Sequence, residues 1–428
     1  MNIHLITTNE DAVLSIDGPD AVDVYGELST ALGNYVTVVA ERKLKTNPLF
    51  VKSVAAMNSF GAMCVKYGLN ELWQFYSRIG RISDGSHYLL FPADDISNED
   101  RKDLKIQLMA IDSGRSAEEL KKGFDDYSRC ILQHYEIVAC YSANISQTKI
   151  GNADKDHRKC RFCGRTEAGG VTFDKKAHAI SELLGNKSIV LRDECDQCNG
   201  GIVNVMESSM TTYFKALRPM LGVRGKSGIP VCQQRGIEIA NNGSRHVDIR
   251  LPKDAFKIES VENGHLKASL EVDCGDYVPQ YIYRMLAKYA VSVLPESTFD
   301  LDVFQDLRDW IRGLKTKCSE LPLVAETVDG NRNPQDPSIV VYRRRDDVPE
   351  NLPLFLVDLY IVAVRFMFEL PYLEKTHKLV SRESWQMLFD AIPSFGNYKD
   401  WNYNDFSSLQ KCRLSNTLIF TAEQKNNV

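Results

Sequence analysis

The sequence lacks a long uncharged hydrophobic run. Its most apolar stretch, residues 352–373, contains Asp358, Arg365 and Glu369, and three charges argue against a membrane-spanning helix. The first residues also lack a basic segment followed by an apolar core, so we expect no secretory signal and a cytoplasmic location. Repeats and low-complexity tracts are missing as well, and the 43% apolar and 25% charged residues are ordinary for a globular protein.

An overall excess of positive charge is also missing. Lysine and arginine together number 52 against 57 aspartates and glutamates, which gives a net charge of −5. The whole protein is therefore not a basic polyanion binder, and any contact with nucleic acid must be local. With 428 residues the chain is too long for one typical core, so we expect two or three domains.

The chain divides by pattern into three parts, and the predicted fold class is multidomain α+β. Residues 1–150 form a mixed α/β domain, residues 151–227 a module rich in Cys, His, Asn and Gly, and residues 228–428 an α+β domain. No catalytic motif marks the two flanking parts, so their roles stay open.

Apolar periodicity predicts the elements of the flanking parts. Residues 2–7 and 35–41 are predicted strands, 20–33 a helix, 116–148 a helical segment, 236–273 an antiparallel hairpin meander, 278–294 and 301–314 helices, and 325–338 a loop. The meander is expected to pack on the helices that follow it, in a domain distinct from the central module.

Four of the eleven cysteines form two Cys-x-x-Cys pairs, and the other seven stand alone, as buried thiols in a reducing compartment do. The pairs are Cys160 with Cys163 and Cys195 with Cys198. Two such knuckles supply the four thiolates of a closed structural zinc site, which leaves no coordination position for chemistry. The alternative is a redox dithiol beside an unrelated second pair, but no thioredoxin-like βαβ pattern surrounds either pair.

The segment between and after the knuckles carries a longer pattern. It comprises Ala177-His178, Ile180, Glu182, Leu184-Gly185-Asn186-Lys187, Glu194-Cys195-Asp196, Cys198-Asn199 and Glu207. Over residues 150–210 this resembles the zinc-knuckle bacterial branch of the HNH endonuclease superfamily. The resemblance implies a central zinc-stapled ββα-metal module, flanked by mixed α/β regions, that hydrolyses nucleic acid with Mg²⁺ or Mn²⁺. It also implies a bacterial setting such as anti-phage defence.

The resemblance assigns roles to individual residues. His178 takes the position of the general base, and Asn199 that of a ligand to the catalytic divalent metal, with Glu207 as a second ligand two helical turns on. Two positions depart from the pattern. Ala177 stands where many members carry an acidic metal ligand, for which Asp174 is a substitute, and Asn186 is the nearest orienting residue for the base.

Plainer interpretations of the same residues stay open. Asn199 begins an Asn-Gly-Gly sequence, which is a natural turn. Glu207 is equally interpretable as a solvated helix residue, and a lone histidine such as His178 is most often an ordinary polar or core residue. Glu182 is interpreted as structural.

The central segment is locally basic. Residues 155–192 contain nine basic and four acidic side chains, a local excess of +5 in a chain of net charge −5. The candidate nucleic-acid contacts are Lys159, Arg161, Lys175, Lys176 and Lys187. The charge fits a module that contacts phosphates, and the resemblance implies a metal-dependent endonuclease with DNA the favoured substrate and a regulatory protein as a partner. The alternative is a zinc-knuckle nucleic-acid-binding protein that has lost cleavage.

Overall fold

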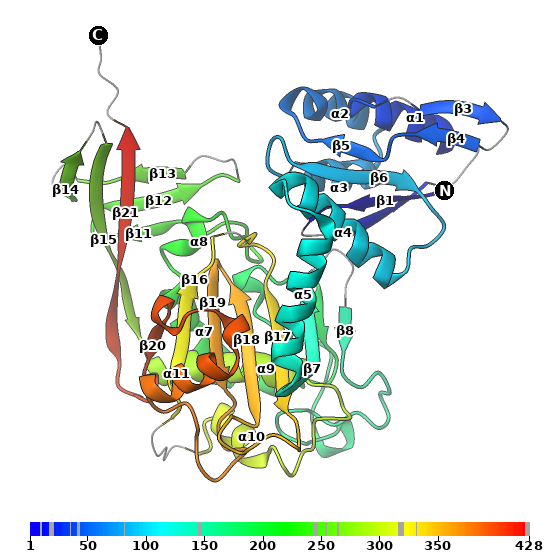
Figure 1. Cartoon of the computed structure of the whole chain (residues 1–428). Helices are drawn as coiled ribbons and strands as arrows, with labels where there is room; N and C mark the ends of the chain where they lie inside the picture. Colours follow the sequence, from blue (N-terminus) through cyan, green and yellow to red (C-terminus); the bar gives the residue numbers. More distant parts are fainter. Residues whose placement is uncertain are drawn as a thin grey trace. The chain divides into compact units, whose positions relative to one another are not determined.

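The structure is a computed structural model of residues 1–428. It describes the chain except residues 9–10, 17–20, 35, 41–42, 81, 144–147, 244–246, 253–254, 263–264, 316–320, 331 and 424–428. The chain forms two compact units, Met1–Arg129 and Cys130–Val428 (Figure 1). Both contain helices and sheets, consistent with the predicted α+β class. No helix within the described ranges is long and apolar enough to cross a membrane.

The first unit is built on a four-stranded antiparallel sheet of order β2-β1-β6-β5, with a separate β3-β4 hairpin. Its elements are β1 (Asn2–Ile6), β2 (Asp11–Ser15), α1 (Ala21–Ala31), β3 (Val36–Ala40), β4 (Lys43–Thr46), β5 (Leu49–Val51), α2 (Val54–Tyr67), α3 (Asn70–Ile79), β6 (His87–Pro92) and α4 (Asn98–Ser113). The helix α5 (Ala117–Leu132) begins in this unit and ends in the first residues of the second. The core includes Tyr25, Phe60 and the stacked pair Phe50 and Tyr88. The strands and helix predicted over residues 2–41 are therefore present.

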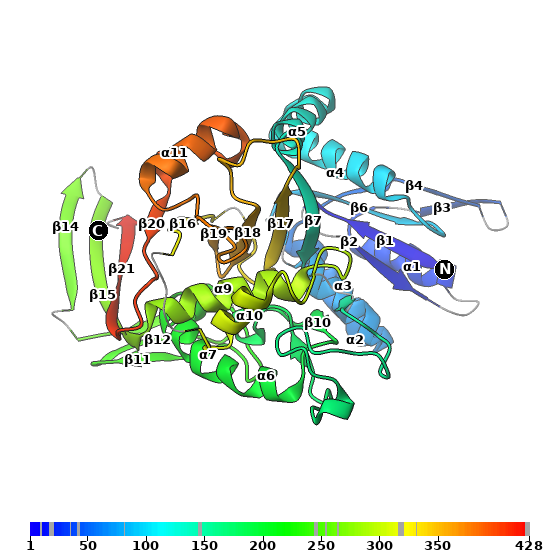
Figure 2. The ribbon, with the colours of Figure 1, turned by 90° about the horizontal axis from the view of Figure 1, so that it is seen from below.

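The second unit has a six-stranded antiparallel sheet of order β20-β16-β19-β18-β17-β7 at its centre. The strands are β7 (Tyr135–Ser142), β16 (Val324–Val328), β17 (Ser338–Arg344), β18 (Phe355–Ile361), β19 (Val364–Glu369) and β20 (Asn402–Asn404). Figure 2 shows α9 (Pro279–Val293) and α11 (Arg382–Ala391) on opposite faces of this sheet. Because side chains alternate along a strand, Val357 of β18 joins the α9 core and Leu356 joins the α11 core.

The predicted meander is present as antiparallel strands that continue to Tyr277. Two three-stranded sheets, β11-β12-β13 and β14-β15-β21, pack their inner faces together. Their strands are β11 (Cys232–Gln234), β12 (Ile237–Asn241), β13 (Val247–Arg250), β14 (Phe256–Glu262), β15 (His265–Tyr277) and β21 (Cys412–Glu423). The short helix α8 (Leu217–Met220) lies against β12, whereas α10 (Gln305–Ile311) packs on α9.

Two predicted elements differ in the structure. The helical spacing over 116–148 ends at Leu132, and the following residues form β7, because they pair with β17 about 200 positions later in the chain. The predicted loop over 325–338 begins with residues of β16, which are fixed between β19 and β20. In both places long-range strand pairing overrides the local pattern.

The unit boundary also differs from the predicted limits of 1–150, 151–227 and 228–428. Because β7 pairs with β17 and β8 (Thr148–Ile150) with β10 (Ile189–Leu191), residues 135–150 belong to the second unit. A single hydrophobic core then extends from Ala139 through the Cys-rich segment to Phe406, with α9 at its centre. The Cys-rich segment and the C-terminal part are thus one folded unit.

Candidate zinc and catalytic site

The Cys-rich segment has the order strand, strand, helix. β9 (Ala177–His178) pairs antiparallel with β10, which places His178 opposite Val190. The helices α6 (Asp196–Gly200) and α7 (Ile202–Tyr213) follow β10 directly. The short hairpin therefore presents His178, and the helical segment that follows carries Asn199 and Glu207.

The four cysteines of the two pairs come together. All four sulfur atoms lie within 4.8 Å of one another, and the Sγ atoms of Cys163 and Cys195 are 3.7 Å apart. Four Zn–S bonds of 2.3 Å arranged as a tetrahedron separate neighbouring sulfurs by about 3.8 Å. The cluster is therefore compatible with a zinc site, as predicted from the spacing.

The protonation of the cluster thiols is also consistent with a metal site. The adjacent Cys160 thiol and burial raise the pKa of Cys163 to about 12. Without a metal the Cys163 thiol therefore stays protonated at neutral pH, whereas a bound divalent cation stabilises the thiolate. In the first knuckle the backbone N–H of Gly164 donates to the carbonyl of Cys160, and Gly164 has a φ of 72°, a left-handed value that suits glycine.

Buried ion pairs attach the knuckles to α9. Arg161 pairs with Asp193 at 3.0 Å and donates to the carbonyl of Val291 at 2.9 Å. Lys288 of α9 pairs with Glu194 at 2.9 Å, and burial raises the pKa of this carboxyl although the nearby ammonium opposes the shift. The predicted contact between Arg161 and nucleic acid is therefore corrected, because this side chain is 2% exposed and holds the fold.

His178 is mostly buried, with 14% of its side chain exposed. Within the described part of the chain its Nδ1 atom is buried without a hydrogen-bond partner, and its Nε2 atom lies 3.6 Å from a carboxylate oxygen of Glu182. Burial lowers the pKa of His178, the charges of Lys176 and Lys288 lower it further, and Glu182 opposes them. The imidazole is thus held neutral at neutral pH, and Nε2 is the ring nitrogen that can reach solvent.

Glu207 faces the segment that follows His178. The hydroxyl of Ser181 donates a hydrogen bond to Glu207 Oε1, which ties α7 to the residues just after β9. The buried Arg218 lies close enough for its charge to interact with Glu207, and burial lowers the pKa of this guanidinium. Glu207 is therefore half-buried in a polar cluster and is not a freely solvated helix residue.

The remaining predicted site residues have different surroundings. Asn186 is fully buried, and its amide makes four hydrogen bonds to the backbone of Ile180, Ser188 and Ile189, so it fixes the loop between β9 and β10. Asn199 is half-buried on α6, and its backbone N–H donates to the carbonyl of Cys195 at 2.9 Å.

Asp196 holds the loop before β9, and Asp174, the predicted substitute for an acidic metal ligand, lies on that loop. The side chain of Asp174 is exposed, and its backbone N–H donates to Asp196. Partial burial would raise the pKa of Asp196, but hydrogen bonds from Thr172, Lys175 and Asp174 lower it. Asp196 therefore attaches this loop to the start of α6.

Four of the five predicted basic contacts are exposed. They are Lys159, Lys175, Lys176 and Lys187. They come from the first knuckle, the loop before β9 and the loop between β9 and β10. Each is available to a polyanion, whereas the buried Arg161 is not.

Sequence reasoning missed three polar residues of the site. Glu182 stands four positions after His178, a spacing that was visible, but it was interpreted as structural alone. Ser181 and Lys288 gave no signal, because a serine in a loop is unremarkable and Lys288 lies 110 positions from His178 along the chain.

Comparison with known proteins adds no relative: no family model, curated protein or solved structure matches this chain. The interpretation of the site therefore depends on its own residues.

Proposed function

We propose that the protein is a divalent-metal-dependent nuclease of the HNH type that hydrolyses phosphodiester bonds, with DNA as the favoured substrate. The observation that carries the proposal is the hydrogen bond between Ser181 and Glu207. It attaches a carboxylate of α7 to the loop that follows His178, which supports a site shared by a base and a metal-binding oxygen.

His178 is the general base in this proposal. Because Nδ1 is buried, Nε2 is the atom that takes the proton from the attacking water. The lowered pKa keeps the imidazole neutral and able to accept that proton at neutral pH. Glu182, at 3.6 Å from Nε2, holds the attacking water in place, and Asn186 positions the hairpin loop through the backbone.

Glu207 and Asn199 would hold the catalytic ion. Mg²⁺ keeps several waters and needs only one or two protein carboxylates, which suits a site with one glutamate and one amide oxygen. When bound, such an ion neutralises charge on the phosphate and stabilises the leaving oxygen. The zinc of the four cysteines is structural in this proposal, and the four exposed lysines contact the phosphate backbone.

One observation favours a second candidate, a zinc-knuckle protein that binds nucleic acid without cutting it. The residue before His178 is Ala177, which is 1% exposed and offers no metal ligand. Asp174, the predicted substitute, is exposed on the neighbouring loop. Under this alternative, binding survives EDTA and no divalent metal produces cleavage.

The test compares wild-type protein with His178→Ala and His157→Ala on plasmid DNA and on RNA, with Mg²⁺, Mn²⁺ or EDTA. His157 is a matched control because it is an exposed histidine of the same segment, paired with Asp154. We expect His178→Ala to lower the cleavage rate by a factor of roughly 10² to 10⁴ and His157→Ala to leave it unchanged. Metal-dependent cleavage that His178→Ala leaves intact would remove His178 from the reaction, and binding without cleavage would favour the second candidate.

A further inference from the structure

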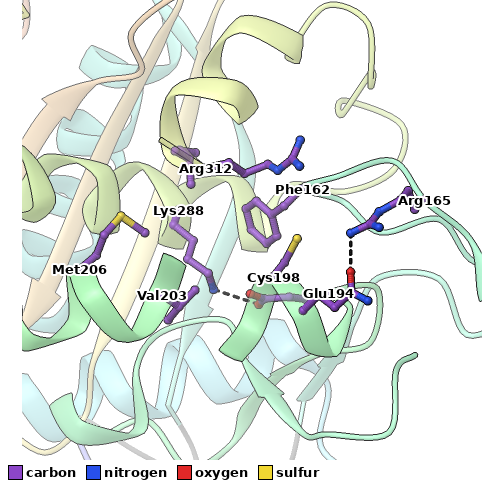
Figure 3. A pocket seen from close by; sticks show the side chains of 10 residues that line it. Phe162, Arg165, Glu194, Cys198, Val203, Met206, Lys288 and Arg312 are labelled. Atoms are coloured by element: carbon purple, nitrogen blue, oxygen red, sulfur yellow. Dashed lines mark hydrogen bonds and ion pairs between the residues drawn. The ribbon is translucent and has the colours of Figure 1, made fainter. Parts of the chain in front are cut away.

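A cavity of about 110 Å³ lies beside the cysteine cluster, between α6, α7, α9 and α10 (Figure 3). Its walls are apolar, with Phe162, Val203, Met206 and Ile311, and Cys198 borders it on the side of the cluster. An engineered cavity of roughly 150 Å³ accepts benzene, so a space of this size holds at most one six-membered ring.

The polar groups of the cavity are a buried carboxylate and a buried ammonium. The side chains of Glu194 and Lys288 are 0% and 4% exposed, and one oxygen of Glu194 accepts from Lys288 at 2.9 Å. The other oxygen, Oε1, is buried and has no hydrogen-bond partner among the described residues. An unsatisfied buried carboxylate oxygen is costly, so a ligand that donates to it is stabilised.

The pair presents an acceptor next to a donor. The bond to Glu194 uses one of the three N–H groups of Lys288, and Glu194 Oε1 accepts beside it. The complementary ligand edge has an amino group next to a ring nitrogen with a lone pair. Cytosine has this edge on a single six-membered ring, whereas adenine has it on a double ring and uracil places an N–H at the ring position.

Two further cations border the cavity. Arg165 is exposed and Arg312 is half-buried, and both line it. Arg312 also pairs with Asp309 at 3.5 Å and Arg165 with Gln197. Among the lining residues Glu194 alone is acidic, against three cations, so the surroundings favour an anionic substituent such as a phosphate on the bound ring.

We propose that this cavity binds a cytosine that carries a phosphate, with the amino group on Glu194 and the ring nitrogen on Lys288. The cytosine comes from a free nucleotide or from an unpaired position in a nucleic-acid strand. The second source alone rests on the proposed nuclease function, in which the cavity would hold an extruded base of the substrate.

The experiment measures binding of CMP, UMP and AMP to the zinc-loaded full-length protein by calorimetry without a catalytic metal. We expect CMP to bind at one site per chain and UMP and AMP to bind at least tenfold more weakly. Uracil presents an N–H where the site requires a lone pair, and the double ring of adenine is too large for the cavity. Val203→Phe fills the cavity and should abolish CMP binding. The matched control Val205→Phe changes an exposed residue of the same helix and should not. Equal binding of the three nucleotides, no binding of CMP, or equal effects of the two variants would overturn the proposal.

A second arm identifies the source of the cytosine. A thymidine oligonucleotide with one central cytosine is tested as a competitor of CMP against an all-thymidine control. Competition by the cytosine strand alone assigns the cavity to a base of the strand, and absence of competition assigns it to a free nucleotide, so either result supports the site. His178→Ala should bind CMP like the wild type, which separates a failure of this site from a failure of the nuclease reaction.

Discussion

Replacing Arg161 with methionine tests the correction that this residue holds the fold. Methionine keeps most of the apolar stem but removes the guanidinium, which pairs with Asp193 and donates to the carbonyls of Val291 and Leu294. Asp193 is 5% exposed, so it would be left as a buried charge without its cation. Breaking a buried ion pair in this way costs about 3–5 kcal/mol.

Urea unfolding provides the measurement. With a slope of about 1–3 kcal/mol per molar urea, this cost shifts the midpoint by an amount on the order of 1–5 M. Release of zinc to a chromogenic chelator follows the second unit specifically, which matters because a two-unit chain need not unfold in one step. The matched control is Arg165→Met, since Arg165 is an exposed arginine of the same knuckle.

The two variants also separate a structural role from a nucleic-acid contact. We expect Arg161→Met to shift the midpoint strongly and Arg165→Met to leave it nearly unchanged. A shift for Arg161→Met no larger than that of the control, together with weaker binding to DNA by a normally folded protein, would refute the structural interpretation. It would return Arg161 to the set of phosphate contacts.

Three further predictions concern the metals and the pH profile. Cys195→Ser should lose zinc and unfold the second unit, measured by metal analysis and near-UV circular dichroism, because zinc binding supplies folding energy; a folded wild-type protein without zinc would contradict this. His178 is active when neutral and its pKa is lowered, so cleavage should persist below pH 6.5 and disappear as pH falls through the lowered pKa. Lys176→Gln removes a cation that lowers this pKa and should move the acid limb of the rate profile to higher pH; an unchanged limb would exclude His178 as the titrating base. Glu207→Gln should raise the Mg²⁺ concentration for half-maximal cleavage severalfold, and an unchanged metal requirement would place the ion elsewhere.

The sequence by itself determined the features that depend on local spacing. Two Cys-x-x-Cys pairs predicted a four-sulfur cluster because a two-residue gap turns both thiols of a knuckle toward one point, and the cluster is present. Apolar spacing predicted the helix over 278–294, which Pro279 begins and Pro295 follows, and α9 covers Pro279–Val293. The alternating residues of 236–273 likewise predicted antiparallel strands.

Only the tertiary structure decided how distant segments share one core. Residues 135–142 follow helical spacing but form β7, because β17 offers a strand to pair with. Arg161 resembles its basic neighbours in sequence, yet it is buried because α9 presents two backbone carbonyls and Asp193 presents its carboxylate. Lys288 faces the zinc segment because the buried carboxylate of Glu194 pairs with it there. Burial and partnership depend on packing across more than 100 residues of chain, and no local pattern specifies them.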